Sequence, residues 1–401
     1  MPNHYDTIII GAGISGLSLA HYCARAGQKT LVIEKSERTG GCFHSHRFDG
    51  DASGFWLELG AHTCYNSYGN LIGIMEEDGL LDRLVKREKV SFRMLVDGRI
   101  RSIPSQLNFP ELLLSVPRLF TLKKNGESVA SYYSRIVGRG NYERVFAPAF
   151  NAVLSQKAGE FPAGMLFNKR PRRKEIMKSF TLVNGLQTIT DALSCEPGVE
   201  VATGTTVSAV DFSDGTYQIK TESGQSYETK NLCLAVPPPA AASLLSGLAP
   251  DISAILGQIK VETIETVGVA VKREKIQLAP LAGIIAPNDI FYSAVSRDTV
   301  PHANYRGFSF HFKGGVASLD EKLKRIAAVL KIEQQELTQF AVRESLLPSP
   351  VVGHEKLTAA IDRLTERKTL FLTGNYFLGL AIEDCISRSR AEFNRLTGRS
   401  R

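Results

Sequence analysis

The sequence of 401 residues lacks any apolar run near the roughly 18 residues that a membrane-spanning helix requires. Its first residues carry no basic stretch followed by a long apolar core, so we expect no secretion signal. The six cysteines are scattered without a C-x-x-C pair. This scatter predicts a reducing cytoplasm and disfavours both a disulfide framework and a zinc site. The length itself predicts two domains.

The formal net charge of +7 is concentrated in one segment. Residues 169–178, KRPRRKEIMK, hold six bases and one acid, whereas the other 391 residues hold 42 bases and 40 acids. The segment is either a solvated loop or a surface that attracts an anionic membrane or substrate. We expect no nucleic-acid partner, because the chain has no nucleic-acid-binding motif and no aromatic residues interleaved with the bases.

A nucleotide-binding fingerprint lies near the N-terminus. Residues 7–10, TIII, form a β-branched run typical of a buried parallel strand, and the pattern G-x-G-x-x-G follows at Gly11, Gly13 and Gly16. Gly11 permits the tight turn, Gly13 lets the backbone approach a pyrophosphate, and Gly16 lets the helix pack closely on the strand. The start of that helix offers free N–H groups and the positive end of its dipole to the phosphates.

The second strand of the fingerprint ends at an acid. Residues 30–34, TLVIE, end at Glu34, eighteen residues beyond Gly16. A carboxylate at this place can accept hydrogen bonds from the adenosine ribose hydroxyls, and its charge would repel the 2′-phosphate of NADP. Strand, turn, helix and acid together predict a dinucleotide site, but they do not separate NAD from FAD.

A second glycine turn follows directly, in residues 34–45, EKSERTGGCFHS, with Arg38, Gly40 and Gly41. A plain NAD site would need no such turn. The segment resembles the extended fingerprint of the FAD-dependent amine oxidase superfamily, which includes the protoporphyrinogen oxidases. The resemblance implies that the glycine pair carries backbone against the pyrophosphate and the flavin.

Two further segments resemble later motifs of the same superfamily. In residues 57–80 the resemblance implies that Gly60, Ala61 and His62 pass beside the flavin ring. In residues 204–239 it implies that the backbone of Val207 contacts the adenine.

The segment 370–390, LFLTGNYFLGLAIEDCISRSR, resembles the last flavin motif of the superfamily. The resemblance implies a strand that ends at Gly374 and a helix after Gly379 whose N-terminus faces the flavin pyrimidine. Asn375 would face the phosphate–ribityl chain, where many relatives carry an acid. The residues that we expect to hold the cofactor are Gly11, Gly13, Ile14, Ser15, Gly16, Glu34, Lys35, Gly40, Gly41, Cys42, Gly60, Ala61, His62, Val207, Gly374, Asn375, Ala381 and Ile382.

The resemblance implies an α/β fold, in which a discontinuous Rossmann-like FAD-binding domain carries an inserted substrate domain of mixed sheet and helices. A hairpin around Asp97 and Gly98 and helices over about 105–165 would belong to the insertion. We expect the FAD-binding domain to comprise 1–85, 178–245 and 346–401. The substrate-binding domain would comprise 86–177 and 246–345.

Within the superfamily, the order of these segments is similar to that of the protoporphyrinogen oxidases. Amine oxidases usually keep a lysine near flavin N5 and an aromatic cage residue in the last motif. The matching positions here are Thr266 and Leu380, which we take as substrate-side candidates. These two residues favour a large conjugated substrate over a small amine.

Two candidate roles stay open. Protoporphyrinogen oxidases tend to place a propionate-binding arginine where this chain has Phe92, so Arg93, one residue along, is either a carboxylate anchor or a solvated arginine. His62 either packs against the flavin or acts as a catalytic base. His44 and His46 have no partner at a metal-ligand spacing, so we expect no metal.

These features predict an FAD-dependent oxidoreductase that moves hydride from a substrate carbon to flavin N5. The favoured substrate is a porphyrinogen-like tetrapyrrole. The alternatives are an amine oxidase, an isoprenoid or carotenoid desaturase, and a flavin-binding assembly protein without turnover. Oxygen or a quinone would accept the electrons, and the sequence leaves the oligomeric state open.

Residues 109–120, FPELLLSVPRLF, are more apolar than an exposed helix needs. They either pack against neighbouring helices or contact a membrane surface, from which an apolar substrate could enter. The expected location is therefore the cytoplasm, with peripheral membrane contact as an open alternative.

Overall fold

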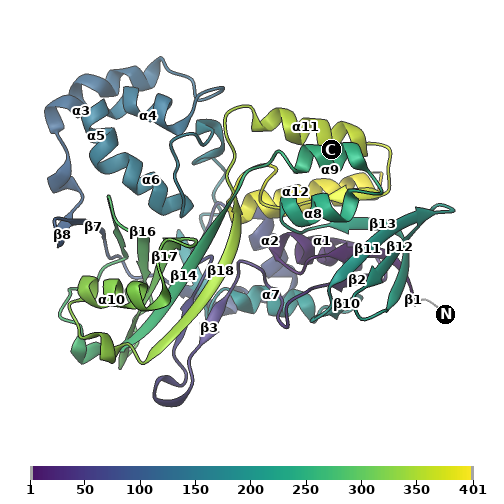
Figure 1. Cartoon of the computed structure of the whole chain (residues 1–401), viewed down its shortest axis with the longest axis horizontal. Helices are drawn as coiled ribbons and strands as arrows, with labels where there is room; N and C mark the ends of the chain where they lie inside the picture. The colour runs from purple at the N-terminus through teal and green to yellow at the C-terminus, as the bar shows by residue number, and fades with distance from the viewer. Residues whose placement is uncertain (1–2, 399–401) are drawn as a thin grey trace.

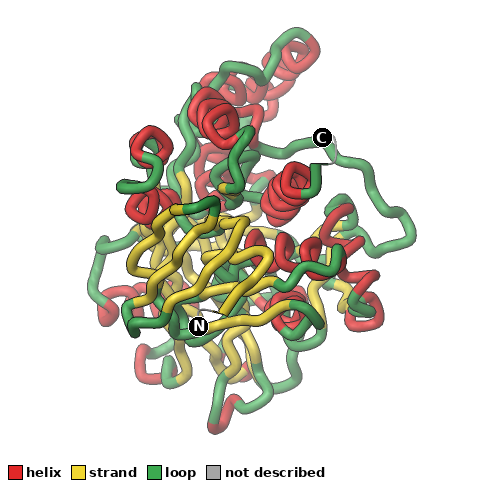
Figure 2. The backbone as a smooth tube through the Cα atoms, turned by 90° about the vertical axis from the view of Figure 1, so that its right-hand side faces the viewer, coloured by secondary structure: helices red, strands yellow, loops and turns green. Residues whose placement is uncertain are grey.

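The computed structural model describes residues 3–398. Its first sheet gathers strands from three distant stretches of the chain, in the order β10-β2-β1-β13-β12-β11, with β19 also paired to β13. In Figure 2 these strands face the viewer around the N-terminus. The strands are β1 (Asn3–Ile10), β2 (Thr30–Ile33), β10 (Val199–Ala202), β11 (Val207–Ser213), β12 (Thr216–Thr221), β13 (Ser226–Leu234) and β19 (Leu370–Leu372).

Helices cover both faces of this sheet (Figure 1). Ile9 of β1 packs into one hydrophobic cluster, whereas Ile8 and Ile10 pack into the other, as the alternation of a strand requires. The first cluster includes α1 (Ile14–Arg25), α2 (Gly69–Glu77), α7 (Gln187–Ser194) and α12 (Ile382–Leu396). The second includes α8 (Pro238–Leu245), α9 (Pro250–Leu256) and α11 (His354–Thr365).

The second sheet is mixed, with the order β18-β14-β17-β16-β15-β7-β8. The expected hairpin is confirmed, since β7 and β8 pair around Asp97 and Gly98, which both have positive φ. The strands are β7 (Phe92–Val96), β8 (Arg99–Ser102), β14 (Val261–Lys272), β15 (Gly283–Ile285), β16 (Phe291–Ser296), β17 (Tyr305–Lys313) and β18 (Gln339–Pro348).

The two faces of the second sheet have different neighbours. Val267 of β14 and Phe310 of β17 pack with α10 (Leu319–Leu330) in one cluster. The opposite face approaches the loop around β4 (Trp56–Glu58) so closely that a Cβ on Gly268 would stand 2.3 Å from Leu59. A larger residue at Gly268 would require the side chain of Leu59 to move at this contact between the second sheet and the rest of the molecule.

The helices expected over about 105–165 are present, and they form a layer with its own hydrophobic cluster. Figure 1 shows this layer at the upper left. The side chain of Ser128 caps α4 by accepting a hydrogen bond from Ser131 N. The layer consists of α3 (Phe109–Ser115), η4 (Val116–Phe120), α4 (Val129–Val137), α5 (Arg139–Asn141), η5 (Tyr142–Phe146) and α6 (Ala147–Leu154).

Short strands and turns connect these parts. The short strands are β3 (Ser45–Arg47), which pairs with β4, and β5 (Cys64–Tyr65), β6 (Leu84–Lys86) and β9 (Ser179–Leu182), which form a small sheet. The helical turns are η1 (Gly50–Ala52), η2 (Leu81–Arg83), η3 (Pro104–Gln106), η6 (Ala163–Met165), η7 (Arg273–Lys275), η8 (Arg297–Thr299) and η9 (Gln334–Glu336).

The expected α/β fold, with a Rossmann-like sheet and a mixed second sheet, is confirmed. The domain boundaries stay a prediction. Within residues 3–398, the structure has no helix that combines the length and the hydropathy needed to cross a bilayer.

Candidate active site

The first glycine turn leaves backbone groups open toward a ligand. Gly11 has φ +106°, and its N–H donates to Ile33 O at 2.8 Å. A Cβ on Gly16 would stand 1.9 Å from Gly11 O, so helix α1 can approach the turn only with glycine there. Gly13 is the N-cap of α1, and no side chain caps the helix. The first N–H groups of α1, from Ile14 on, are therefore free to bind a phosphate.

The second glycine turn lies directly against the first. Gly40 N donates to Ala12 O at 2.8 Å, and Gly13 and Gly40 form an isolated bridge. A Cβ on Gly41 would stand 2.9 Å from Gly13 Cα. The two turns thus present one continuous stretch of backbone, as an elongated pyrophosphate requires.

Glu34 is held against the first turn. One carboxylate oxygen accepts from Ala12 N at 2.8 Å and the other from Ser36 N at 2.9 Å. The carboxylate therefore stands at the end of β2 beside the phosphate turn, whereas the neighbouring Lys35 is exposed. A contact between Glu34 and a ribose stays a prediction.

Arg38 braces the second turn. Its Nη1 donates to Thr39 O at 2.8 Å and to Phe43 O at 3.1 Å, and its Nη2 donates to Gly41 O at 2.9 Å. Burial, followed by the charge of Arg343, lowers the pKa of Arg38 to about 10. The loop is thus fixed by a partly buried cation, which suits an anionic ligand nearby.

The third loop, Gly60 to His62, docks on the second. Ala61 N donates to Cys42 O at 2.8 Å, and a Cβ on Gly60 would stand 2.2 Å from the same oxygen. The Nδ1 of His62 lies 3.3 Å from Gly60 O, and the carbonyl of His62 accepts from Arg87. Burial lowers the pKa of His62 to about 4, so its imidazole is neutral at pH 7 and a weak base.

The last predicted motif also reaches this region. Strand β19 ends at Leu372, two residues before Gly374, and Asn375 is half-buried. Helix α12 begins at Ile382 with Ala381 as its N-cap, without a side-chain cap. The N–H groups at the start of α12 are therefore open to an acceptor.

The two ends of the chain meet through α1 and α12. The hydroxyl of Ser389 donates to Ser15 O at 2.7 Å. Val207, which we expect near the adenine, starts β11 in the first sheet. The predicted cofactor residues therefore all belong to the first sheet, its helices or the loops beside it.

A row of paired residues crosses the second sheet on the face opposite α10. Its central members are Arg343, Thr266, His311 and Ser293, on strands β18, β14, β17 and β16. Thr266 Oγ1 and His311 Nδ1 share a hydrogen bond of 2.9 Å. Burial lowers the pKa of His311 to about 3, so this pair is uncharged at neutral pH.

Arg343 was missed in the sequence, although it connects the row to the cofactor loops. Its Nη2 donates to Gly41 O at 2.5 Å. The strand 339–348 alternates between half-buried and exposed positions, and Arg343 occupies a half-buried one. The sequence shows this alternation, but it does not show which group the arginine contacts.

Arg93 does not join this row. It pairs with Ile284, and both Ile284 and Leu95 pack in the cluster that includes α10. Met94, one residue along, is the one that pairs with Ile285 on the other face. Because neighbouring residues of a strand point to opposite faces, Arg93 lies away from the candidate site.

Leu380 packs against the hydrophobic cluster of the helical layer. The last cofactor loop therefore contacts the helices that are expected to cover the substrate.

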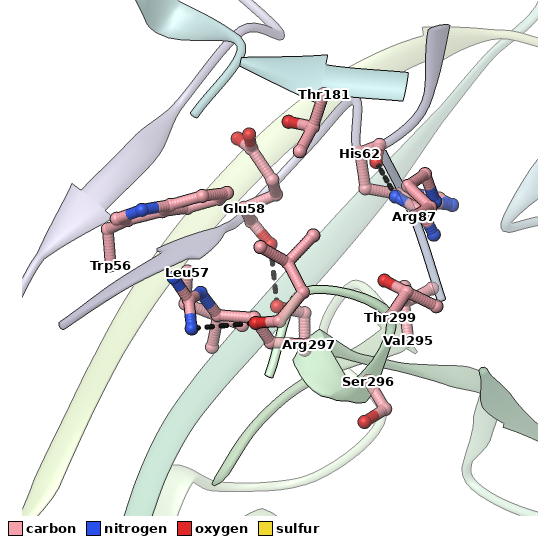
Figure 3. A pocket seen from close by; sticks show the side chains of 12 residues that line it. Trp56, Leu57, Glu58, His62, Arg87, Thr181, Val295, Ser296, Arg297 and Thr299 are labelled. Carbon is pink, nitrogen blue, oxygen red and sulfur yellow. Dashed lines mark hydrogen bonds between the residues drawn. The ribbon is translucent and has the colours of Figure 1, made fainter. Parts of the chain in front are cut away.

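A small cavity opens beside His62 (Figure 3). Its volume of ≈ 20 Å³ suits a water molecule and excludes an organic substrate. Glu58 lines it and accepts from Ser45 Oγ at 2.8 Å and from Leu186 N at 2.7 Å. Burial raises the pKa of Glu58 to about 7.

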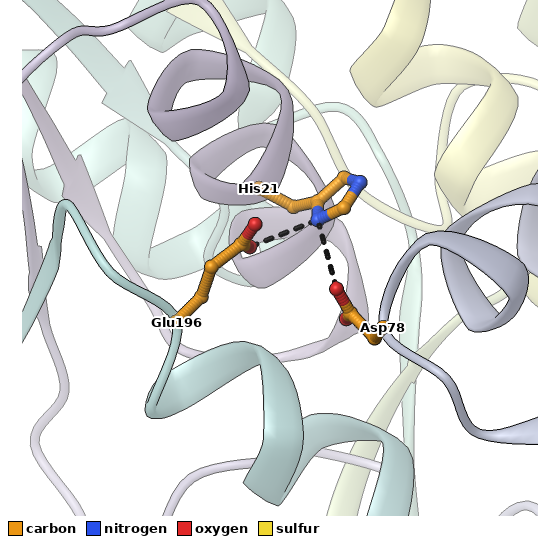
Figure 4. Close-up of side chains that lie close together, drawn as sticks. All are labelled: His21, Asp78 and Glu196. Carbon is orange, nitrogen blue, oxygen red and sulfur yellow. Dashed lines mark hydrogen bonds and ion pairs between the residues drawn. The ribbon is translucent and has the colours of Figure 1, made fainter.

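A separate cluster joins α1 to α2 and to the turn after α7 (Figure 4). Ligand atoms of His21, Asp78 and Glu196 lie within 4.8 Å of one another, close enough for one metal ion. However, His21 Nδ1 lies 2.8 Å from Glu196, and Arg25 reaches both Glu196 (2.8 Å) and Asp78 (3.0 Å). The cluster thus carries its own cations, and we assign it no metal.

A family model and several curated proteins match this chain. A family model described as flavin containing amine oxidoreductase matches residues 14–298. The chloroplast protoporphyrinogen oxidase of Nicotiana tabacum is 23% identical over 475 aligned positions, which cover 98% of this chain and 85% of that protein. The 15-cis-phytoene desaturase of Narcissus pseudonarcissus is 32% identical over 108 residues, but this match spans 27% of the chain and only 18% of that protein.

Solved structures share the fold at low identity. A protein of Exiguobacterium sp. 255-15, proposed to be a protoporphyrinogen oxidase, superposes with a TM-score of 0.77 at 19% identity, over 97% of this chain and 98% of that one. Reduced UDP-galactopyranose mutase gives a TM-score of 0.74 at 16% identity, over 99% and 96%. Wild-type putrescine oxidase bound to putrescine gives 0.72 at 13% identity, over 99% and 100%.

Proposed function

The chain belongs to the family of flavin containing amine oxidoreductases, and from this premise we propose that its substrate is a porphyrinogen-like tetrapyrrole. It is an FAD-dependent oxidoreductase that resembles the protoporphyrinogen oxidases and acts on a small molecule with an electron acceptor. The observation that carries the substrate is the match to the tobacco protoporphyrinogen oxidase, which runs through nearly the whole of both chains.

The residues present fit FAD. The uncapped N-termini of α1 and α12, together with the glycine turns at 11–13 and 40–41, would hold the pyrophosphate and the flavin. Bound FAD would supply a hydride acceptor at flavin N5. The chain's part is to bind and orient the substrate carbon, because the uncharged pair Thr266 and His311 offers no strong base.

Two side chains favour the tetrapyrrole over an amine. Thr266 stands where amine oxidases usually carry lysine, and Leu380 stands near their cage aromatic. Both are uncharged, and Leu380 packs on the apolar helical layer. A large conjugated substrate gains more from such surfaces than a small cation would.

Anaerobic reduction of the bound flavin tests this proposal. Purified holoprotein would be mixed with protoporphyrinogen, coproporphyrinogen, phytoene, benzylamine or putrescine, and the flavin absorbance followed over time. We expect rapid bleaching with a porphyrinogen alone. Bleaching by phytoene alone would support desaturation, the alternative that the Narcissus match favours. Reoxidation in air, compared with a soluble quinone, would identify the acceptor.

We also propose that the helical layer contacts a membrane surface. The side chains of Leu113, Leu114 and Phe120 are 74%, 81% and 87% exposed. Leu112 packs against the neighbouring helices, whereas these three side chains are left exposed. A cluster of exposed large apolar residues is typical of an interaction surface.

Bases lie near this apolar cluster. Arg118 and Lys123 are exposed, and Lys169 is close enough to Lys124 to lower its pKa, after the effect of burial. Such charges would add attraction to anionic headgroups, at about 1 kcal/mol each near the surface.

Only part of the basic segment 169–178 can serve such a surface. Arg170 pairs with Asp384 of α12, and Arg173 pairs with Glu76 at 2.6 Å and with Glu175. Both arginines therefore hold the segment to the nucleotide-binding part. Lys169, Arg172 and Lys174 are exposed.

Liposome flotation tests the membrane contact. We expect the protein to rise with vesicles rich in anionic lipid at low salt, and the variant Leu113→Ser/Leu114→Ser/Phe120→Ser to stay at the bottom. Val316→Ser, at an exposed apolar residue outside the helical layer, is the matched control. A wild type that remains at the bottom with every lipid would reject the contact.

Since all six cysteines are free, we keep a reducing cytoplasm as the proposed compartment.

A further inference from the structure

Arg343 brings a guanidinium from the second sheet to the cofactor loops. Its Nη2 donates to Gly41 O, and its Nη1 lies 3.0 Å from the place where a Cβ on Gly60 would stand. Gly41 in turn contacts Gly13 of the phosphate-binding turn. The guanidinium therefore lies where the second loop meets the third, beyond the phosphate turn.

The second terminal nitrogen of Arg343 is buried without a hydrogen-bond partner in the described part of the chain. Among residues 3–398, no carboxylate forms an ion pair with it either. A buried donor on a charged group is costly when unsatisfied. Arg38 donates to the same carbonyl of Gly41, so two like charges converge there. An acceptor that carries negative charge would stabilise this arrangement.

We propose that Nη1 of Arg343 donates a hydrogen bond to the ring of bound flavin, and that its charge stabilises the reduced, anionic ring. The inference rests on the FAD site of the proposed function, but not on the tetrapyrrole. Glu34 and the start of α1 mark the adenosine and phosphate end, whereas Arg343 lies toward Gly60.

The neighbours of Arg343 make its charge distinctive. Its partner across the strands is Thr266, and the next residue of the row is His311, whose pKa burial lowers. Arg343 is therefore the cation that the central part of this row offers to the cofactor. It acts here as a positioning and tuning residue, because it would touch the flavin without exchanging a proton with the substrate.

The same row provides a matched control. Its far end is Arg101 on the edge strand β8, where the side chain is exposed. The two arginines thus share a sheet and a row, and they differ in whether the guanidinium lies at the cofactor loops.

Arg343→Met, Arg343→Lys and Arg101→Met would be compared as holoproteins by sulfite titration and by flavin reduction potential. Sulfite leaves a negative charge on the flavin ring, so its affinity reports a nearby cation without any substrate. Arg343→Met should raise the sulfite Kd by about tenfold or more, as for loss of a charge-assisted hydrogen bond. The same factor lowers a two-electron potential by about 30 mV. Arg343→Lys should retain most of the sulfite affinity, and Arg101→Met all of it.

The outcomes distinguish a contact between Arg343 and the flavin ring from a contact with another part of FAD. Unchanged sulfite affinity and potential in Arg343→Met would overturn the proposal. A rise in the FAD Kd with neither property changed would place the contact at the phosphates, which also overturns it. If Arg343→Met does not retain FAD, Arg343→Gln, which removes the charge but keeps a hydrogen-bond donor, is measured in its place: weaker sulfite binding than in Arg343→Lys supports a charge at the ring, and equal binding overturns it. A changed potential in a protein that ignores porphyrinogens would reject the tetrapyrrole alone.

Discussion

The glycine turns and the cross-strand row form the site in different ways. At the turns the backbone itself makes the surface, and a Cβ on Gly16, Gly41 or Gly60 would stand within 3 Å of other main-chain atoms. In the row the backbone is ordinary strand, and the side chains of Thr266 and His311 make the surface. We therefore expect the turns to tolerate almost no substitution, whereas the side chains of the row can be replaced without loss of the sheet.

Three buried histidines differ in how their surroundings change the pKa. Burial lowers the pKa of His21, but its hydrogen bond to Glu196 and the neighbouring carboxylates raise it to a net value above normal. Burial lowers the pKa of both His62 and His311. The charged form of His21 is thus stabilised by Glu196, whereas burial keeps His62 and His311 neutral at pH 7. One fold can host different reactions, because function depends on the residues of the site.

The largest expected effect belongs to Gly16. In Gly16→Ala the new Cβ would stand 1.9 Å from Gly11 O, so the helix must move away from the turn. We expect destabilisation of about 3 kcal/mol or more and loss of FAD, measured by thermal unfolding and by cofactor release. Gly73→Ala is the matched control, because it also lies in a helix but has no atom within 4 Å of its Cβ position. Equal behaviour of the two variants would refute the close contact.

Glu34→Ala should have a smaller effect on FAD binding than Gly16→Ala. The carboxylate holds Ala12 N and Ser36 N and is expected to bind the ribose. Losing a charged acceptor costs about 1.5–3 kcal/mol, which corresponds to roughly 10- to 150-fold weaker FAD binding. Titration of apoprotein with FAD measures it, with the exposed Glu37→Ala as the control. An unchanged Kd would remove Glu34 from the site.

The pH dependence of stability should have opposite signs at His21 and at His311. The raised pKa of His21 contributes stability that is present below about pH 6.5 and lost as the pH rises through its folded pKa. The lowered pKa of His311 contributes stability that is present above about pH 6.5 and lost as the pH falls.

Unfolding by urea at a series of pH values measures both contributions. His21→Gln should flatten the alkaline side of the profile, by about 1–3 kcal/mol, and His311→Gln the acidic side. The contrast between the two histidines fails if either variant changes the opposite side.

The smallest expected effect is the absence of amine oxidation. Benzylamine and putrescine should leave the flavin oxidised, because Thr266 and Leu380 offer neither the lysine nor the cage aromatic. Anaerobic absorbance checks this, with the buffer alone as the baseline. Rapid reduction by either amine would show that Thr266 and Leu380 do not select against small cations.

The glycine turns, where the backbone forms the surface of the site, are the part of this molecule that the sequence predicts best. A Cβ cannot fit at Gly11, Gly16, Gly40 or Gly41 without disturbing the turns, so the sequence displays the cofactor site as a spacing of glycines. Alternation likewise predicts the hairpin around Asp97. The placement of the cofactor residues around bound FAD stays a prediction.

The unpredictable part depends on contacts between distant strands. Arg343 reaches Gly41 from a strand that lies about 300 residues later, and no local pattern encodes that pairing. The outcome for Arg93 depended on which face of β7 meets α10, which only the packed sheet reveals. The ion pair between Arg170 and Asp384 could not be predicted for the same reason, because composition gives the charge of a segment but not the residue with which it pairs.

The pairing of β13 with β19 has a consequence for the synthesis of the protein. Leu232–Leu234 pair with Leu370–Leu372, and Ser389 then closes on Ser15. At about 5–20 residues per second, a ribosome needs on the order of 10 s between making the first of these strands and the second. During that time the nascent sheet exposes an apolar edge, and the helix α12 that completes the flavin loop does not yet exist. With the cofactor placed as predicted, FAD can be bound completely only after translation has nearly finished, and we expect a chaperone that shields β13 in the interval to increase the yield of holoprotein.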